Sequence, residues 1–317
     1  MDGVHSIETL FDNIFEKLPD YIESKVYLCT HKWKRYYSFF EARKHQGEIN
    51  HITGDIHTIA LFLDKNKTIL TVHDIGRLER DLRGLKKRIF KLLWLDLPLK
   101  RVKYITTISD FTKKRLVEVC KISPEKIHVI PNPSSNDFTY NQNSYDKKSP
   151  CILQMGSGNN KNIYRLIEAI KGTSFRLLLI RKPNTKIKKL LEVYNISFEW
   201  KYNISRQQVY ECYLKCDIVF FASEYEGFGM PILEANSVGR PVVTSKLSSM
   251  PFVAGESALL VNPFSVEEIR ASLIKLHNNA SLRDKLIAKG LKNLKRFSIE
   301  RITEQYVELY HEIKRKG

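Results

Sequence analysis

Two glutamates stand eight positions apart in a segment that is rich in glycine. Glu226 and Glu234 lie in SEYEGFGMPILEANSVG, residues 223–239, which follows the apolar run IVFFA. Carboxylates repel phosphate but accept hydrogen bonds from hydroxyl groups, so their natural partners are the hydroxyls of a ribose or a sugar. The same residues also fit a surface loop with two solvated acids, and this alternative stays open here.

The segment around these glutamates predicts a strand, a glycine loop and a helix in that order. Pro231 comes close to the first position of the helix, and Gly239 ends it. Backbone N–H groups converge where a glycine loop enters a helix N-terminus, and the helix dipole adds partial positive charge. The sequence therefore predicts a phosphate site with two carboxylates nearby.

The elements that must position these residues alternate between strand and helix along the chain. Apolar runs such as residues 175–180 and 218–222 predict parallel strands buried on both faces. Residues 131–150 are rich in Pro, Asn and Ser, which favours a linker between two such blocks. We therefore expect an α/β protein with two Rossmann-like domains that face a cleft.

The residues resemble a known family over most of the chain. EGFGMPILEA (226–235), followed by GRPVV (239–243), is similar to the nucleotide-sugar signature of the family 4 retaining glycosyltransferases, which have the GT-B fold. GSGNNKN (156–162) resembles the start of that family's C-terminal domain. TVHDI (71–75) resembles its segment with an active-site histidine, and residues 297–310 resemble its closing helix.

The resemblance implies transfer of a sugar, with retention at the anomeric carbon, from a nucleotide-sugar donor to a saccharide or lipid-linked saccharide. The expected pathway is cell-surface polysaccharide or glycolipid biosynthesis. Two alternatives stay open: a non-catalytic nucleotide- or membrane-binding module that kept the fold, and an epimerase or hydrolase relative. The expected domains are 1–132, a linker over 133–150, a nucleotide-sugar-binding domain over 151–298, and a helix over 299–317 that crosses back to the first domain.

The resemblance also assigns roles to residues of this sequence. Glu234 is expected on the donor ribose, Glu226 on hydroxyls of the donor sugar, and Lys161 on the departing diphosphate, where negative charge grows. His73 is expected to touch the sugar or order the acceptor, although a structural histidine at a strand end fits that position equally well. The expected catalytic residues are His73, Lys161 and Glu226; the expected donor-binding residues are Gly156, Lys161, Glu226, Gly227, Phe228, Gly229, Met230 and Glu234.

No metal or other cofactor is expected. The sequence has no Asp-x-Asp, and no His or Cys pair has the spacing of a structural zinc site. Lys161 and a helix N-terminus can meet the phosphates instead, so we predict metal-independent catalysis.

The sequence departs from the family pattern at several places. Asn160 stands where the family commonly has arginine, and Arg181 stands where it usually has glycine. We expect Arg181 to supply the missing cationic contact. The chain also enters a helix almost at once instead of opening with a hydrophobic strand, which predicts a shortened N-terminal domain or a sequence that starts late.

The basic residues point to anionic partners. Lys and Arg outnumber Asp and Glu by 52 to 35, and residues 77–103 carry ten of them against three acids. We predict a long basic helix over Leu78–Trp94 that lies on an anionic membrane surface, while a core-packed helix with a solvated cationic face fits equally well. Nucleic acid is not an expected partner, because no zinc-finger, helix-turn-helix or RNA-binding signature occurs.

The expected location is cytoplasmic, peripheral on the inner face of the plasma membrane. The five cysteines are an odd number without a framework spacing, which is typical of reduced thiols in the cytoplasm.

Overall fold

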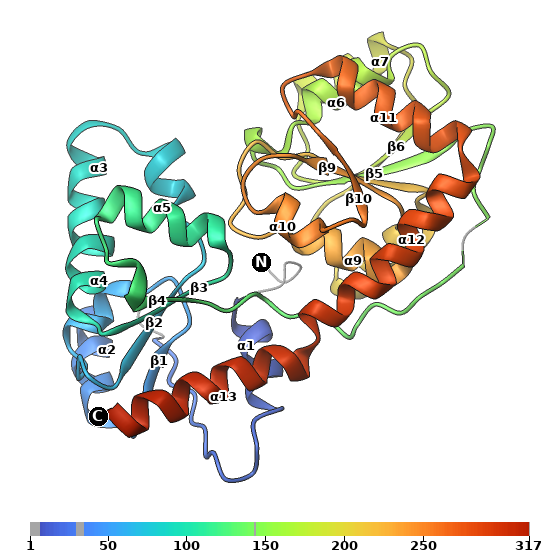
Figure 1. Ribbon diagram of the computed structural model, residues 1–317. Helices are drawn as coiled ribbons and strands as arrows, with labels where there is room; N and C mark the ends of the chain where they lie inside the picture. The colour runs from blue at the N-terminus through green and yellow to red at the C-terminus, as the bar shows by residue number, and fades with distance from the viewer. Residues whose placement is uncertain (1–6, 30–34, 143, 317) are drawn as a thin grey trace. The chain divides into compact units, whose positions relative to one another are not determined.

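The protein consists of two compact units in a computed structural model that describes residues 7–29, 35–142 and 144–316. Of the described residues, those within 134–298 form the C-terminal unit, and those within 7–133 together with 299–316 form the N-terminal unit. Each unit is built on one parallel sheet covered by helices (Figure 1). The predicted α/β class with two parallel-sheet domains is therefore confirmed.

The N-terminal unit has a four-stranded parallel sheet in the order β1-β2-β3-β4. Its strands are β1 (Asn50–Ile52), β2 (Thr68–Val72), β3 (Tyr104–Thr107) and β4 (Ile127–Val129). Its helices are α1 (Ile7–Phe15), α2 (Arg35–Ala42), α3 (Gly84–Phe90), α4 (Leu97–Arg101), α5 (Asp110–Cys120) and α13 (Ile299–Lys316). Shorter helical turns are η1 (Arg43–His45), η2 (His57–Leu61), η3 (Arg77–Asp81), η4 (Lys91–Asp96) and η5 (Pro124–Lys126).

Both faces of this sheet are covered, which explains why all five residues of β2 are buried. Helices α1 and α13 lie side by side and pack on one face (Figure 1). Helix α13 buries Ile299, Ile302, Tyr306, Leu309 and Ile313, a spacing of three to four residues that keeps one stripe toward the sheet. Helices α2, α4 and α5 contribute to a second apolar cluster.

The C-terminal unit has a six-stranded parallel sheet in the order β10-β9-β8-β5-β6-β7. Its strands are β5 (Cys151–Met155), β6 (Arg176–Ile180), β7 (Phe198–Lys201), β8 (Ile218–Phe221), β9 (Val242–Ser245) and β10 (Ala258–Val261). Its helices are α6 (Ile163–Ile170), α7 (Thr185–Val193), α8 (Arg206–Lys215), α9 (Met230–Val238), α10 (Met250–Ala254), α11 (Val266–Asn278) and α12 (Ala280–Leu294), with turns η6 (Asn159–Lys161) and η7 (Lys295–Phe297). The strand order reverses between β5 and β8, and ligands of open α/β sheets bind beyond the carboxyl ends of the strands at such a point.

The segment predicted as a linker contains no helix or strand in its described residues, but it is fastened to the C-terminal unit. Arg240 donates to the carbonyl oxygen of Asn141 at 2.7 Å. The Thr139 and Tyr210 hydroxyls lie 2.9 Å apart. Hydrogen bonds therefore attach this segment to the C-terminal unit.

Two sequence predictions in the N-terminal unit are wrong. The sequence KVYLC (residues 25–29) predicts a short strand, but these residues are not a strand. Tyr27 and Cys29 pack against the core while Val26 and Leu28 are exposed, so burial alternates as in a strand, but no described strand pairs with this segment. The basic helix expected over Leu78–Trp94 is interrupted, because Leu82 and Arg83 are extended. Helical structure resumes at Gly84 and continues to Arg101 through α3, η4 and α4.

Candidate active site

The loop between β5 and α6 is shaped by a glycine. Gly156 has a φ of +94°, and a Cβ added there would lie 2.8 Å from Cε of Lys161. Only glycine adopts this conformation readily and leaves the space that the lysine side chain occupies. The Lys161 side chain therefore packs over Gly156 and extends toward the loop that follows the neighbouring strand β8.

Lys161 reaches Glu226, which comes from the loop after β8. Its Nζ lies 2.6 Å from Oε1 of Glu226 and 5.0 Å from the centre of the Phe221 ring. The two charged side chains are 22% and 16% exposed. The structure thus brings together the predicted phosphate-binding cation and the predicted sugar-binding carboxylate.

Hydrogen bonds hold these two loops together at the carboxyl ends of the neighbouring strands β5 and β8. The Asn160 side chain donates to the Tyr225 carbonyl at 2.9 Å, and the Glu224 N–H donates to the Asn160 carbonyl at 2.9 Å. Asn162 donates to the carbonyls of Ala222 and Pro263 at 3.1 and 2.6 Å. Lys161 and Glu226 therefore lie on two loops that hydrogen bonds join, at the point where the strand order reverses.

The glycine turn before α9 carries the other predicted donor contacts. Gly227, Phe228 and Gly229 are buried, and Gly229 has a φ of +138°. The Ser249 hydroxyl donates to the Glu226 carbonyl at 3.0 Å and also contacts that of Phe228. Helix α9 then begins at Met230 with proline in its first turn, a position that proline favours.

Glu234 lies in α9 and is only 5% exposed. Its Oε1 accepts from Arg206 at 2.6 Å, and its Oε2 accepts from the Tyr213 hydroxyl at 2.6 Å. Burial, and then the nearby Glu234 charge, raise the pKa of Tyr213 well above its usual value, so the phenol stays protonated and donates. Each carboxylate oxygen keeps a further lone pair that can accept from a hydroxyl group.

Sequence reasoning missed Arg206 and Tyr213. Both lie on α8, whose start is fixed by a capping box between Ser205 and Gln208. That capping signal predicts where the helix begins, but it does not indicate that the first helical residue meets a glutamate of another helix. Only the packing of α8 beside α9 shows this contact.

His73 belongs to the N-terminal unit, whereas the residues above belong to the C-terminal unit. It directly follows β2, and its Nε2 donates to the Thr53 carbonyl at 2.7 Å. Because a carbonyl only accepts, the proton sits on Nε2 and Nδ1 keeps a lone pair. Desolvation lowers the pKa of His73, so the ring is neutral and can accept a hydroxyl proton.

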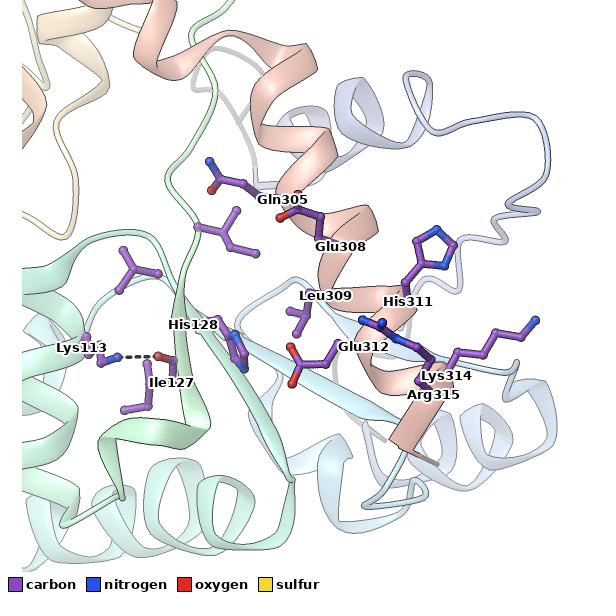
Figure 2. A pocket seen from close by; sticks show the side chains of 12 residues that line it. Lys113, Ile127, His128, Gln305, Glu308, Leu309, His311, Glu312, Lys314 and Arg315 are labelled. Carbon is purple, nitrogen blue, oxygen red and sulfur yellow. Dashed lines mark hydrogen bonds between the residues drawn. The ribbon is translucent and has the colours of Figure 1, made fainter.

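A groove of about 1080 Å³ lies elsewhere in the N-terminal unit, between β4 and α13 (Figure 2). Its lining includes His128, Glu308 and Glu312. None of the residues predicted for the site lines it.

The described residues contain neither a metal-binding cluster nor a membrane-spanning helix. No three or more His, Cys, Asp or Glu side chains are grouped so that they could hold a metal ion. None of the described helices has the length and hydropathy needed to cross a bilayer.

Two family models match adjacent parts of the chain. The model described as Glycosyltransferase Family 4 matches residues 36–135, and the model described as Glycosyl transferases group 1 matches residues 136–293. Their common boundary is close to the division between the two units after Pro133.

The chain is also similar to curated bacterial proteins. It is 42% identical over 90 residues to O-antigen chain mannosyltransferase B of Escherichia coli, a match that covers 28% of this chain and 24% of that protein. It is 29% identical over 216 residues to the O-antigen chain mannosyltransferase RfbU of Salmonella typhimurium, covering 65% of this chain and 59% of the relative. The matches thus span less than two thirds of these relatives' own lengths.

Solved structures share the fold at low identity. Sucrose-phosphate synthase from Thermosynechococcus elongatus has a TM-score of 0.75 at 18% identity, covering 92% of this chain and 82% of that one. Anabaena HepE in complex with UDP and glucose has a TM-score of 0.74 at 14% identity, covering 97% of both chains. With the family models, these similarities show that the chain belongs to the family 4 glycosyltransferases of the GT-B fold.

Proposed function

We propose that this protein is a retaining glycosyltransferase that moves a hexosyl group from a nucleotide-sugar donor to a saccharide or lipid-linked saccharide acceptor. The expected setting is synthesis of a cell-surface polysaccharide or glycolipid, which the names of the O-antigen mannosyltransferase relatives support. The observation that carries the proposal is the contact between Lys161 and Glu226, made by two loops at the reversal of the strand order.

The chemistry of the C-terminal unit fits a donor that combines phosphates, a sugar and a ribose. As the bond to the anomeric carbon breaks, negative charge grows on the departing phosphate, and Lys161 supplies the positive charge that stabilises it. The N-terminus of α6 and the Gly156 loop add backbone dipoles of the same sign. Glu226 and Glu234 then accept hydrogen bonds from hydroxyls of the sugar and the ribose.

We propose that this reaction runs without a resident metal ion. The cationic side chain and the helix N-terminus take the place that a divalent cation would have beside the diphosphate. Turnover in excess EDTA that equals turnover in Mg²⁺ supports this proposal. Activity that disappears with EDTA and returns with one divalent metal contradicts it.

Nucleotide binding is the first test of the donor site. A thermal-shift titration with UDP, GDP, dTDP and ADP in EDTA is expected to select one nucleotide. A ligand present at 100 times its Kd adds about 2.7 kcal/mol to the free energy of unfolding. We expect the Glu234→Ala variant to lose this shift while remaining folded. A folded wild-type protein that responds to none of the nucleotides would favour the non-catalytic module instead.

Product analysis separates the transferase from its enzyme alternatives. The sugar nucleotide of the selected base is incubated with and without a saccharide or lipid-linked acceptor. A transferase forms a glycosylated acceptor with the anomeric configuration of the donor. Release of free sugar at the same rate without an acceptor indicates a hydrolase, and an isomerised donor indicates an epimerase.

We further propose that the N-terminal unit rests on an anionic membrane surface, the inner face of the plasma membrane. Five aliphatic side chains of the segment 84–97 are 40–71% exposed: Leu85, Ile89, Leu92, Leu93 and Leu97. Their spacing puts them on one side of the helical segment, and Lys86, Arg88 and Lys100 are exposed nearby in sequence. Exposed aliphatics flanked by cations suit the boundary between acyl chains and anionic headgroups.

Trp94 is not part of this face. Its Nε1 donates to Asp55 at 2.8 Å, and its ring stacks on Phe90 at a centroid distance of 5.8 Å. The tryptophan therefore packs within the unit, and the exposed leucines and isoleucine carry the proposal. The described cysteines are free thiols, which supports a cytoplasmic location.

Vesicle sedimentation tests the membrane proposal. We expect binding to vesicles that contain phosphatidylglycerol, weakening with salt, and little binding to phosphatidylcholine alone. Changing Leu85, Ile89 and Leu92 together to Ser is expected to abolish binding and leave nucleotide affinity unchanged. The matched control is Val193→Ser, since Val193 is 67% exposed on α7 of the other unit. Equal binding by the triple variant and the control contradicts the proposal.

A further inference from the structure

Arg181 is a buried cation with few partners. It follows the last residue of β6 and is 6% exposed. Its two terminal nitrogens lie 3.4 Å from the Gln154 side-chain oxygen and 3.5 Å from the Ser157 carbonyl oxygen, both at the outer limit of a hydrogen bond. Its Nε is buried and has no hydrogen-bond partner among the described residues.

Two other buried arginines of the same unit show how this fold satisfies a structural guanidinium. Arg240 is 1% exposed and donates to carbonyl oxygens of several residues, among them Cys216 at 2.9 Å and Asn141 at 2.7 Å. Arg283 is 7% exposed, donates to two carbonyls at 2.6 and 2.9 Å, and lies over the Tyr145 ring. Arg181 is buried to the same degree without comparable partners.

The charge of Arg181 is also uncompensated. Among the described residues no carboxylate forms an ion pair with it, and desolvation lowers its pKa. The guanidinium nevertheless stays charged, because its ordinary pKa lies far above neutrality. A buried charge without a counter-ion destabilises the folded protein, and a nearby anion recovers part of that free energy.

The position of Arg181 beside the loop after β5 indicates which anion could balance its charge. The loop after β5 is held to β6 by the Gly156 N–H, which donates to the Ile180 carbonyl at 2.9 Å, and by Ser157, whose hydroxyl accepts from the Lys182 N–H at 2.6 Å. Arg181 contacts the same loop at Ser157. Two cations are thus associated with this loop, Lys161 within it and Arg181 beside it, and among the described residues only Lys161 of the two has a carboxylate partner.

We propose that Arg181 is a positioning residue whose buried charge is balanced by the diphosphate of the bound donor. It acts through the 156–161 loop, since its Nε is closed to solvent. The free protein therefore holds an excess positive charge under this loop, and binding of a diphosphate neutralises it. This inference rests on the proposed donor site and extends it to a residue that follows the adjacent strand.

Arg181→Met and Arg181→Lys test the inference. For Arg181→Met we expect a ligand-free melting temperature equal to or above that of the wild type, because an unpaired buried charge is removed. Its affinity for the selected nucleoside diphosphate is expected to fall about tenfold or more, while affinity for the uncharged nucleoside stays within about twofold. Arg181→Lys is expected to restore most of the diphosphate affinity.

Arg283→Met is the matched control, because it removes an equally buried guanidinium that has carbonyl partners. We expect it to lower the melting temperature and to leave diphosphate affinity unchanged. If Arg181→Met behaves in the same way, Arg181 is structural and the inference is wrong.

Inorganic pyrophosphate separates this inference from the proposed function. A wild-type protein that binds pyrophosphate through Arg181 but binds no nucleotide contradicts the proposed function and keeps this inference. An Arg181→Met variant that binds the nucleoside diphosphate as tightly as the wild type contradicts the inference alone. A folded wild-type protein that binds neither ligand contradicts both.

Discussion

Lys161 is the residue on which the proposed chemistry depends most. We predict that Lys161→Ala lowers kcat by about 10²- to 10³-fold, the usual loss when one group that stabilises developing negative charge is removed. Stability is expected to change by no more than about 1 kcal/mol, because the ion pair with Glu226 is partly exposed to solvent. Initial rates with saturating donor, together with thermal melts, check both expectations.

Lys188→Ala is the control for this prediction. Lys188 lies 3.9 Å from Glu192 on an exposed side of α7. The substitution therefore removes another Lys–Glu ion pair, at a place away from the two loops. Its kcat is expected to stay at the wild-type level. A Lys161→Ala enzyme with normal kcat would show that phosphate charge is stabilised by other groups.

At the residue scale, motifs in the sequence indicate residues that the structure brings together, whereas they give no sign of the contacts that packing creates. Lys161 and Glu226 are expected on one ligand because their segments resemble motifs of the family 4 glycosyltransferases. Nothing in the spacing of Arg206 or Tyr213 indicated that both would engage Glu234. Such pairs depend on the side-by-side packing of two helices, which short-range patterns do not determine.

At the scale of elements, the docking of α13 depends on a neutral histidine. His51 lies in β1, with Nδ1 2.8 Å from the Tyr310 hydroxyl of α13 and Nε2 2.7 Å from the Thr71 hydroxyl of β2. Desolvation lowers the pKa of His51 to about 3. The folded unit therefore excludes a proton that the unfolded chain accepts near pH 6.5.

We predict that acidification destabilises the N-terminal unit through this histidine. Between pH 6.5 and the folded pKa of about 3, the unfolded state binds more protons, so the free energy of unfolding falls as the pH falls. From pH 6.5 to 5 the loss attributable to His51 is about 2 kcal/mol. Urea unfolding at both pH values, followed by tyrosine fluorescence, measures this loss.

His51→Gln provides the comparison, because an amide bonds to neighbouring hydroxyls but does not titrate. The variant is less stable at pH 7, and its stability is expected to change less than that of the wild type between pH 6.5 and 5. An equal pH dependence in both proteins would assign the acid sensitivity to other groups, such as His57 and His73, whose pKa values desolvation also lowers.

Elements were predicted well where an apolar run is buried on both faces, and poorly where the run has no pairing partner or the helical pattern is interrupted. The apolar runs of β5, β6 and β8 are strands because they are buried on both faces. Residues 25–29 have strand-like alternation but no pairing partner, and a strand needs both. The break in the basic helix occurs before Gly84, whose φ of +54° is left-handed.

At the scale of the whole molecule, the chain leaves the N-terminal unit after Pro133 and returns to it at Ile299. The last helix therefore completes a core whose other members lie more than 160 positions earlier in the sequence. Ile302, Tyr306 and Ile313 of α13 are each no more than 2% exposed against this core. Removing the helix leaves an apolar face of the sheet open to water, where several large side chains each lose about 1.5–3 kcal/mol of burial.

We predict that truncation after Ser298 unfolds the N-terminal unit and spares the C-terminal unit, whose sheet lies entirely within residues 134–298. Calorimetry with and without the selected nucleotide distinguishes the units, because only the transition of the nucleotide-binding unit shifts with ligand. Truncation after Ile313 is the control: it removes the exposed ion pair of Lys314 with Glu48 and is expected to change stability by less than about 1 kcal/mol. If the chain ending at Ser298 keeps both transitions, α13 is not required for the N-terminal fold, and its apolar stripe must stabilise the protein in another way.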